Sequence, residues 1–306
     1  MRTTAIIFNK AWELEPALAA LCSPEFRPIG LPFPTTLLSL KDRRPNSTYT
    51  STDPRAVFRF YENNNPDSPL QYEVSIWCIQ DMMDKAVSGS DSVEKYRVLP
   101  PVLAAYKPDL VMAAGTAGYP MDSPVAGCVV AGSRFFIHDG HPNNTSHLNL
   151  SCYETLFPQN VNPAILGLFN PPLKQVAEPL FIKPPVNPCV RPALLASQYM
   201  TAVSSLNVLD YGEYAWVDKE AAASFRKVND SLPIGSIETT HALIRLSSGQ
   251  PCMFVSAITD SEGRFDIEVN NPQNYICSFN AGVALGNLIV AINNQLTKTP
   301  GLSFGL

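Results

Sequence analysis

The chain has 306 residues, enough for one large α/β domain or two small ones and for a sizeable hydrophobic core. Hydrophobic residues make up 45% of it and charged residues 16%, which is ordinary for a globular protein. The formal net charge is −5 and the basic residues are scattered. This argues against nucleic acid as a partner, because phosphate backbones are bound by clustered Lys and Arg.

The first 114 residues alternate between strand and helix patterns. Apolar runs and helical spacing predict strands at 5–8, near 57–61, at 72–79 and at 110–114, and helices at 13–21 and 92–106. Pro16 is tolerable if it lies in the first turn of its helix, whereas Pro100-Pro101 should kink or split the second helix. Residues 23–70 are rich in Pro, Asn, Ser and Thr, and we expect an irregular excursion there.

The second part of the chain continues the alternation. We expect strands at 127–131, 134–138 and 253–259, and helices at 197–208 (leading to a strand), 218–228, 237–247 and 280–294. Asn280 is a plausible N-cap of the last helix. Residues 142–192 are dense in proline and predict a second irregular excursion. The whole chain, 1–306, therefore predicts a single α/β domain with a mixed central β-sheet flanked by helices.

The seven cysteines are an odd number and none forms a CxxC pair, so they indicate neither zinc binding nor a thioredoxin-type motif. Four lie in or beside apolar stretches, where a free thiol behaves as a small hydrophobic group: Cys78, Cys128, Cys252 and Cys277. We expect buried thiols and a reducing, cytoplasmic compartment. The short apolar N-terminus predicts a first strand rather than a secretion signal, and no apolar stretch reaches membrane-spanning length, so no membrane partner is expected.

Two distant segments place small polar or acidic residues where a ligand could bind. Residues 113–118 follow a buried strand with a small-residue loop, in which Gly115 and Gly118 let the backbone approach a ligand and Thr116 offers a hydroxyl. A tight turn after a strand is the plainer interpretation. The loop matches neither a dinucleotide-binding fingerprint nor a Walker phosphate loop.

The second segment comprises residues 235–240 and the strand that ends at residue 260, and it carries two carboxylates. Glu238 lies just inside an expected helix start, where an acidic residue is favoured by the helix dipole. Asp260 ends a strongly apolar strand, and ligands of open α/β sheets gather at the carboxyl ends of strands. A turn or N-cap aspartate is the alternative.

The order of these motifs resembles the purine nucleoside phosphorylase and nucleosidase superfamily, which includes methylthioadenosine/S-adenosylhomocysteine nucleosidase. Its "G-S/T-A-G" loop matches Gly115–Gly118, its "Met-Glu" pair matches Ile237-Glu238, and its "S-D" pair matches Thr259-Asp260. Residues 127–131 and 136–139 resemble the intervening "GDvvva" and "YHD" segments. Residues 212–220 resemble the base-binding stretch.

The resemblance implies cleavage of the N-glycosidic bond of a purine-type nucleoside, which is the small-molecule partner expected. It gives Asp260 the role of general acid at the purine N7 and Glu238 that of holding the ribose hydroxyls, with Thr116 near the ribose or the nucleophile. Ile237, Trp216 and Val217 would flank the base. Glu13 is the expected activator of water, and Glu15 is the fallback, because the motif around them does not align cleanly.

The identity of the nucleophile separates two activities on this scaffold. Bacterial-type phosphorylases carry an arginine immediately before the glycine loop, whereas this chain has Ala113-Ala114. Arg43, Arg44 and Arg55 could supply a phosphate pocket from the excursion, although nothing in the sequence places them there. We therefore favour hydrolysis over a phosphorylase that uses inorganic phosphate as co-substrate. A non-catalytic nucleoside-binding or storage protein is a third possibility.

No metal or other cofactor is expected. His138, His141 and His147 lie within ten residues, but in a Gly/Asn/Pro loop without a matching acidic cluster. The resemblance implies no metal and a homo-oligomer, a dimer or larger.

Overall fold

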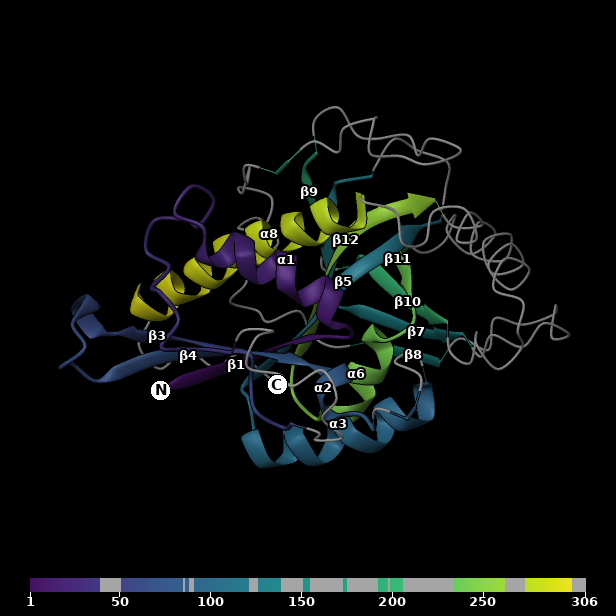
Figure 1. Cartoon of the computed structure of the whole chain (residues 1–306), viewed down its shortest axis with the longest axis horizontal. Helices are drawn as coiled ribbons and strands as arrows, with labels where there is room; N and C mark the ends of the chain where they lie inside the picture. Colours follow the sequence, from purple (N-terminus) through teal and green to yellow (C-terminus); the bar gives the residue numbers. More distant parts are fainter. Residues whose placement is uncertain are drawn as a thin grey trace, which may run out of the picture.

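The computed structural model describes residues 1–38, 51–84, 86–87, 91–120, 126–138, 151–154, 173–174, 192–197, 199–205, 234–261 and 273–298. These residues form a central sheet of 12 strands, with helices on both of its faces (Figure 1). The strand order along the main path is β2-β3-β4-β1-β5-β11-β10-β7-β8. Parallel and antiparallel pairs both occur, as predicted for a mixed α/β sheet.

The N-terminal strands form one half of the sheet. Their bounds are β1 Arg2–Phe8, β2 Thr36–Leu37, β3 Ala56–Tyr61, β4 Leu70–Cys78 and β5 Leu110–Tyr119. β1 runs parallel to both of its neighbours, so that Phe8 lies opposite Cys78 on one side and Ala114 on the other. Because both faces of β1 are covered along its second half, residues 5–8 are a continuous apolar run, and this made the strand predictable.

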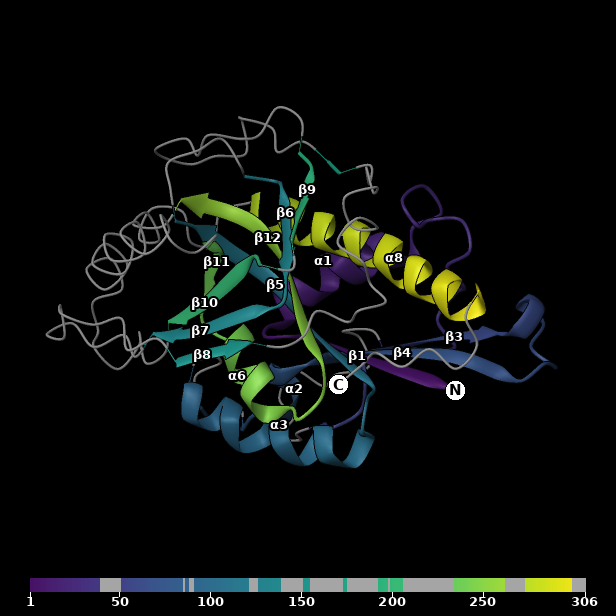
Figure 2. The same cartoon turned by 180° about the vertical axis from the view of Figure 1, so that it is seen from behind.

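The remaining strands join the sheet through β5. Their bounds are β6 Val129–Gly132, β7 Arg134–His138, β8 Ser151–Glu154, β9 Leu194–Ala196, β10 Thr201–Ser205, β11 Ile234–Glu238 and β12 Cys252–Ser261. β12 runs parallel to β5, and β6 and β9 follow it on the side that faces the C-terminal helix (Figure 2). β11 meets the opposite edge of β5 near its end. Among the described strands, only β5 pairs with all of β1, β11 and β12.

β5 continues through the small residues for which the sequence predicts a ligand loop, and this part of the prediction is wrong. The predicted strand ends at Ala114, whereas β5 extends to Tyr119 and contains Gly115 and Gly118. The reason is lateral pairing. β12 pairs with this stretch on one edge and β11 on the other, and their hydrogen bonds override the low strand propensity of glycine.

Two predicted helices are also corrected. Residues 201–205 form strand β10 rather than a helix, because parallel pairing with β7 and β11 on both edges suits their β-branched side chains. The predicted helix at 237–247 begins only at His241, since Ile237 and Glu238 end strand β11. The predicted helix at 218–228 lies outside the described residues.

The helices form two layers, one on each face of the sheet (Figure 1). Their bounds are α1 Ala11–Cys22, α2 Ile79–Met82, α3 Ser92–Tyr106, α6 His241–Ser247 and α8 Gln273–Lys298, and a single 3-10 turn, η2, spans Glu62–Asn64. α1 and α8 cover one face and α2, α3 and α6 the other, with a separate hydrophobic cluster under each layer. Pro16 is the sixth residue of α1, so it lies in the second turn and not in the first as predicted.

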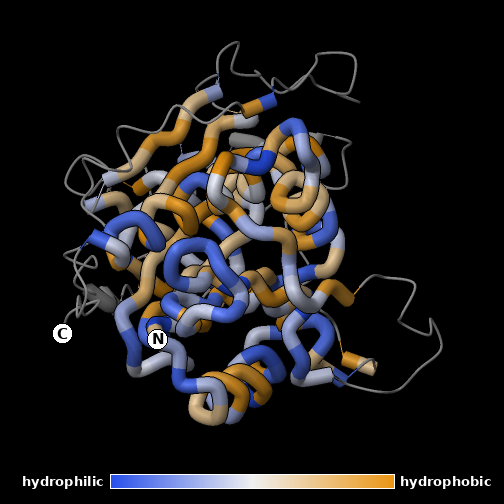
Figure 3. The backbone as a smooth tube through the Cα atoms, turned by 90° about the vertical axis from the view of Figure 1, so that its left-hand side faces the viewer, coloured by the Kyte–Doolittle hydropathy of each residue, from blue (hydrophilic) through white to orange (hydrophobic). Residues whose placement is uncertain are grey.

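Helix α3 has the predicted bounds and is not split at Pro100-Pro101. The two prolines lack N–H groups that would otherwise bond to the carbonyls of Tyr96 and Arg97. Both of those residues are exposed, so water can take the place of the missing donors. In Figure 3 this helix, at the bottom, alternates between hydrophobic and hydrophilic colouring as its buried and exposed faces follow one another.

Helix α8 is much longer than the predicted 280–294. Asn280 is therefore an interior residue and not the N-cap; its side-chain amide donates to the carbonyls of Gly127 and Lys174, both at 2.8 Å. Residues 274–298 are long and apolar enough to cross a membrane, contrary to the sequence-based expectation, but 72% of the most apolar window is buried inside the protein. The core helix of a globular fold has the same composition.

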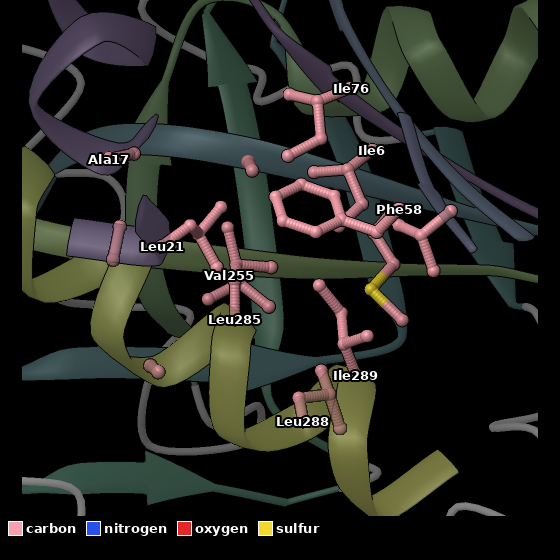
Figure 4. Close-up of a cluster of buried hydrophobic side chains, with 14 of the residues drawn as sticks. Ile6, Ala17, Leu21, Phe58, Ile76, Val255, Leu285, Leu288 and Ile289 are labelled. Atoms are coloured by element: carbon pink, nitrogen blue, oxygen red, sulfur yellow. The ribbon is translucent and has the colours of Figure 1, made fainter. Parts of the chain in front are cut away.

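α8 packs against α1 and against the sheet. Leu285, Leu288 and Ile289 of α8 face Ile6 and Phe58 of β1 and β3 in the cluster that Figure 4 shows. Closer to the start of α8, Gly282 lies directly on the backbone of α1, and a Cβ added there would be 2.6 Å from the Cα of Ala17. The absence of a side chain at Gly282 therefore lets the two helices approach closely.

Candidate active site

Glu13 is buried and is held beside Thr116 of β5 by hydrogen bonds. Its side chain is only 5% exposed, and β1 and the first turn of α1 carry it to the carboxyl end of β5. Oε1 accepts hydrogen bonds from the backbone N–H of Thr116 at 2.9 Å and from its hydroxyl at 2.8 Å. Oε2 accepts one from the N–H of Lys10 at 3.1 Å. The structure thus brings together two predicted site residues that are 103 positions apart.

Gly115 makes this contact possible. A Cβ built on Gly115 would lie 2.9 Å from Oε1 of Glu13, closer than real Cβ atoms approach a neighbour. A glycine in a central strand is otherwise unfavourable, because it packs no side chain. Gly115 therefore leaves room for the Glu13 carboxylate and does not belong to a loop.

Glu238 is the last residue of β11, and its carboxylate connects that strand to α6. One oxygen accepts a hydrogen bond from the hydroxyl of Ser204 on β10, and the other accepts from the N–H groups of Thr240 and His241, the latter at 2.7 Å. The side chain is 6% exposed. Glu238 therefore satisfies the amino end of α6 from outside the helix.

The ends of three strands meet at Gly118. Ile237 of β11 lies opposite Gly118 on one edge of β5, and Asp260 of β12 lies opposite it on the other. A bulge between Ile258 and Asp260 shifts the register of β12 by one residue at this point. For Asp260 the structure describes the backbone position, and this position brings the predicted acid and the predicted sugar-binding strand to the same residue of β5.

Lys95 of α3 is a buried residue that the sequence-based prediction missed. It is 0% exposed, and its ammonium group donates to the hydroxyl of Thr240 at 2.9 Å and faces that of Thr239 at 3.5 Å. Burial, and next the nearby charge of Lys10, lower the pKa of Lys95 to about 7. The helical spacing of Ser92, Lys95 and Leu99 puts a lysine on the buried stripe of α3, and this spacing was visible in the sequence.

His241 lies behind Glu238. Its Nδ1 is 3.3 Å from the hydroxyl of Ser256, which in turn is 2.9 Å from that of Ser236, and its ring stacks near Phe254. The side chain is buried, so His241 belongs to the wall of the site under Glu238.

Arg55 is held away from a phosphate-binding role. Its buried guanidinium bonds to both oxygens of Asp81 and to Glu15, and burial lowers its pKa. Because Glu15 is committed to this ion pair, it does not face Thr116. Of the two candidate glutamates, Glu13 is the one that contacts β5.

Several predicted residues lie outside the described part of the chain. These are Trp216 and Val217, Arg43 and Arg44, His141 and His147, and the side chain of His138. Within the described residues, no group of three or more His, Cys, Asp or Glu side chains could hold a metal ion. The predicted burial of four cysteines is confirmed: Cys78, Cys128, Cys252 and Cys277 are buried.

No protein-family model and no curated protein sequence matches the chain. Solved structures do match it along almost its whole length. The 5′-methylthioadenosine/S-adenosylhomocysteine nucleosidase of Helicobacter pylori, solved with butyl-thio-DADMe-Immucillin-A, is 12% identical, with a TM-score of 0.53 over 94% of this chain and 98% of that one. The Neisseria meningitidis nucleosidase, in complex with methylthio-immucillin-A, is 14% identical, with a TM-score of 0.52 over 94% and 99%.

A futalosine hydrolase mutant of Helicobacter pylori is 11% identical, with a TM-score of 0.51 over 97% of this chain and 100% of that one. The chain has the nucleosidase fold. The predicted fold class and the structural resemblance are thus confirmed, and at these identities the likeness concerns the fold. The activity has to be argued from the site itself.

Proposed function

We propose that this protein is a nucleosidase that hydrolyses the N-glycosidic bond of a purine-type nucleoside. The observation that carries the proposal is the convergence on β5. Glu13 is bonded to Thr116, while Ile237 and Asp260 lie opposite Gly118 on its two edges. The nucleosidase fold supports the same assignment, because Glu238 and Asp260 occupy the positions of two motifs that the sequence shares with that family.

The reaction requires a general acid at the leaving purine and a general base that accepts a proton from the attacking water. As the bond between the anomeric carbon and the purine nitrogen breaks, its electron pair moves into the purine, and Asp260 supplies a proton at N7. Water adds to the anomeric carbon and gives its proton to Glu13. General acid–base catalysis of this kind typically contributes about 10²–10⁴-fold.

The hydrogen bonds of Glu13 suit a role with water. An ionised carboxylate offers about four lone-pair positions. The three described donors, from Lys10 and Thr116, occupy both positions on Oε1 and one on Oε2. One position of Oε2 is left for a water molecule, and the surrounding bonds fix the direction in which it points.

Glu238 has a similar balance. The described donors, from Ser204, Thr240 and His241, occupy three of its four positions and leave one on Oε1. Glu238 can therefore accept one ribose hydroxyl directly. Accepting a second would require the Ser204 hydroxyl to turn away.

Two observations favour water over phosphate as the nucleophile. Arg55 is already paired with Asp81 and Glu15, and the residues before Gly115 are the buried Ala113 and Ala114. Binding a phosphate dianion normally requires arginine or several hydroxyl and amide donors.

Release of free base from adenosine, inosine, methylthioadenosine and uridine, with and without phosphate, tests the proposal. We expect purine release that does not depend on phosphate and that Glu13→Gln and Asp260→Asn abolish. Asp109→Asn is the matched control, because Asp109 also binds a backbone N–H and a threonine hydroxyl, but at the opposite end of β1 and β5. Activity that requires phosphate would establish the phosphorylase instead.

Binding without turnover of any nucleoside tested would leave a nucleoside-binding or storage protein. Sedimentation of the same protein tests the expected homo-oligomer independently of its activity.

A further inference from the structure

Lys95 is a buried cation to which the proposed chemistry assigns no role. It lies on α3 and its side chain has no exposed surface. No carboxylate of the described residues lies within 4.0 Å of its ammonium group. Burying a charge without an ion pair is costly, so a lysine here needs a reason beyond packing.

The contacts of Lys95 lead to Glu238. Its ammonium group donates to the Thr240 hydroxyl at 2.9 Å. The Thr239 hydroxyl lies 3.5 Å from the ammonium group and 3.3 Å from the Thr240 hydroxyl. These two threonines form the turn between β11 and α6. The backbone N–H of Thr240 is itself a donor to the Glu238 carboxylate. One residue thus links the lysine to the carboxylate.

Four charged groups act on Lys95. Lys10, just before α1, opposes its positive charge, whereas Glu238 of β11, Glu13 of α1 and Asp91 at the start of α3 favour it. Burial is the largest influence, and the pKa falls to about 7. The charged and neutral forms are therefore both populated near neutral pH.

We propose that Lys95 is a positioning residue for Glu238. The charged amine of Lys95 holds the Thr239–Thr240 turn, so that the Glu238 carboxylate stays oriented toward a sugar hydroxyl. The inference rests on the proposed function in that it takes Glu238 as the group that holds the sugar. It adds a residue that touches no ligand and makes sugar recognition depend on the charge of a lysine.

Calorimetric binding of adenosine and of adenine to the full chain separates this role from a structural one. Asp260→Asn serves as the background, so that adenosine is not consumed. Because Glu238 holds only the sugar, we expect Lys95→Met to weaken adenosine binding about 10-fold, as is typical for residues that orient a liganding group, and adenine binding less than twofold. Lys107→Met, at the exposed end of the same helix, should change neither.

The pH dependence gives a second signature. With Lys95 present, adenosine affinity should fall as the pH rises from 7 to 9, while adenine affinity does not follow it; in Lys95→Met the adenosine affinity should lose this dependence. Thr240→Val, which removes the acceptor and keeps the shape, should reproduce the loss. Unchanged adenosine affinity in a folded Lys95→Met protein overturns the proposal.

Amide hydrogen exchange tests the inference even if no purine binds. The N–H groups of Thr240 and His241 donate to Glu238, so Lys95→Met should accelerate their exchange about 10-fold without affecting α8. If the parent protein neither binds nor cleaves any of the purine nucleosides tested above, the proposed function fails. Unaltered exchange at these two amides refutes the role of Lys95 on its own.

Discussion

Replacing Lys95 with methionine should change how the stability of the protein depends on pH. The folded protein lowers the pKa of this lysine from 10.5 to about 7. Between these two values the unfolded chain binds one more proton at this lysine than the folded protein does, so the contribution of Lys95 to the free energy of unfolding rises with pH. The lysine thus contributes a stability term that is fully present above pH 10.5 and is lost as the pH falls toward 7.

The magnitude follows from the same two values. The folded protein loses the Lys95 proton near pH 7, whereas the unfolded chain keeps it up to pH 10.5. The free energy of unfolding should therefore gain about 2 kcal/mol between pH 7 and pH 9. Above pH 9 the trend should reverse. Burial raises the pKa of Cys252 and of Tyr106 to about 12, so the unfolded chain loses these protons first.

Urea unfolding at pH 7, 8 and 9, followed by circular dichroism, measures this term. The wild type and Lys107→Met should gain about 2 kcal/mol across the range relative to Lys95→Met. Lys95→Met should be at least as stable as the wild type at pH 7, because replacing a buried charge by an apolar group is often stabilising. Parallel pH profiles for Lys95→Met and the wild type would refute the reasoning.

Three further substitutions probe features that place the site. Gly115→Ala should cut catalysis at least about 10-fold with a small change in melting temperature, because its Cβ displaces the Glu13 carboxylate; equal turnover would contradict this reading. Gly282→Ala should lower the free energy of unfolding by about 1–3 kcal/mol, since its Cβ meets the backbone at Ala17; a more stable protein would show that the helices can separate freely. Asn280→Ala should cost about 1–3 kcal/mol in chemical denaturation, because two buried carbonyls lose their donor.

Patterns set by local chemistry were readable in the sequence. The strands at 5–8 and 253–259 are largely apolar because both faces are covered, and α3 was predicted with its correct ends. Glu13 and Thr116 were assigned to one site from the resemblance to a family, and in the structure two hydrogen bonds join them.

Features set by neighbours in space were not readable. Gly115 and Gly118 look like a loop until β11 and β12 pair with them, and residues 201–205 look helical until β7 and β11 enclose them. Asn280 resembled a helix cap because its partner at Gly127 is 153 residues away. Lys95 was missed for a different reason: its spacing with Ser92 and Leu99 was readable, but a charged residue on a helix is ordinarily assigned to the exposed side.

The role of β5 in the sheet has a mechanical consequence. If β5 is removed, the described sheet separates into β2-β3-β4-β1, β11-β10-β7-β8 and β12-β6-β9. Within the sheet, the hydrogen-bonded path between any two of these three groups runs through ten residues, Leu110–Tyr119. The candidate site lies at the carboxyl end of β5, between strands of different groups. A ligand bound there would contact more than one group and hold them together. Single-molecule pulling should then find that bound nucleoside raises the force at which the groups come apart.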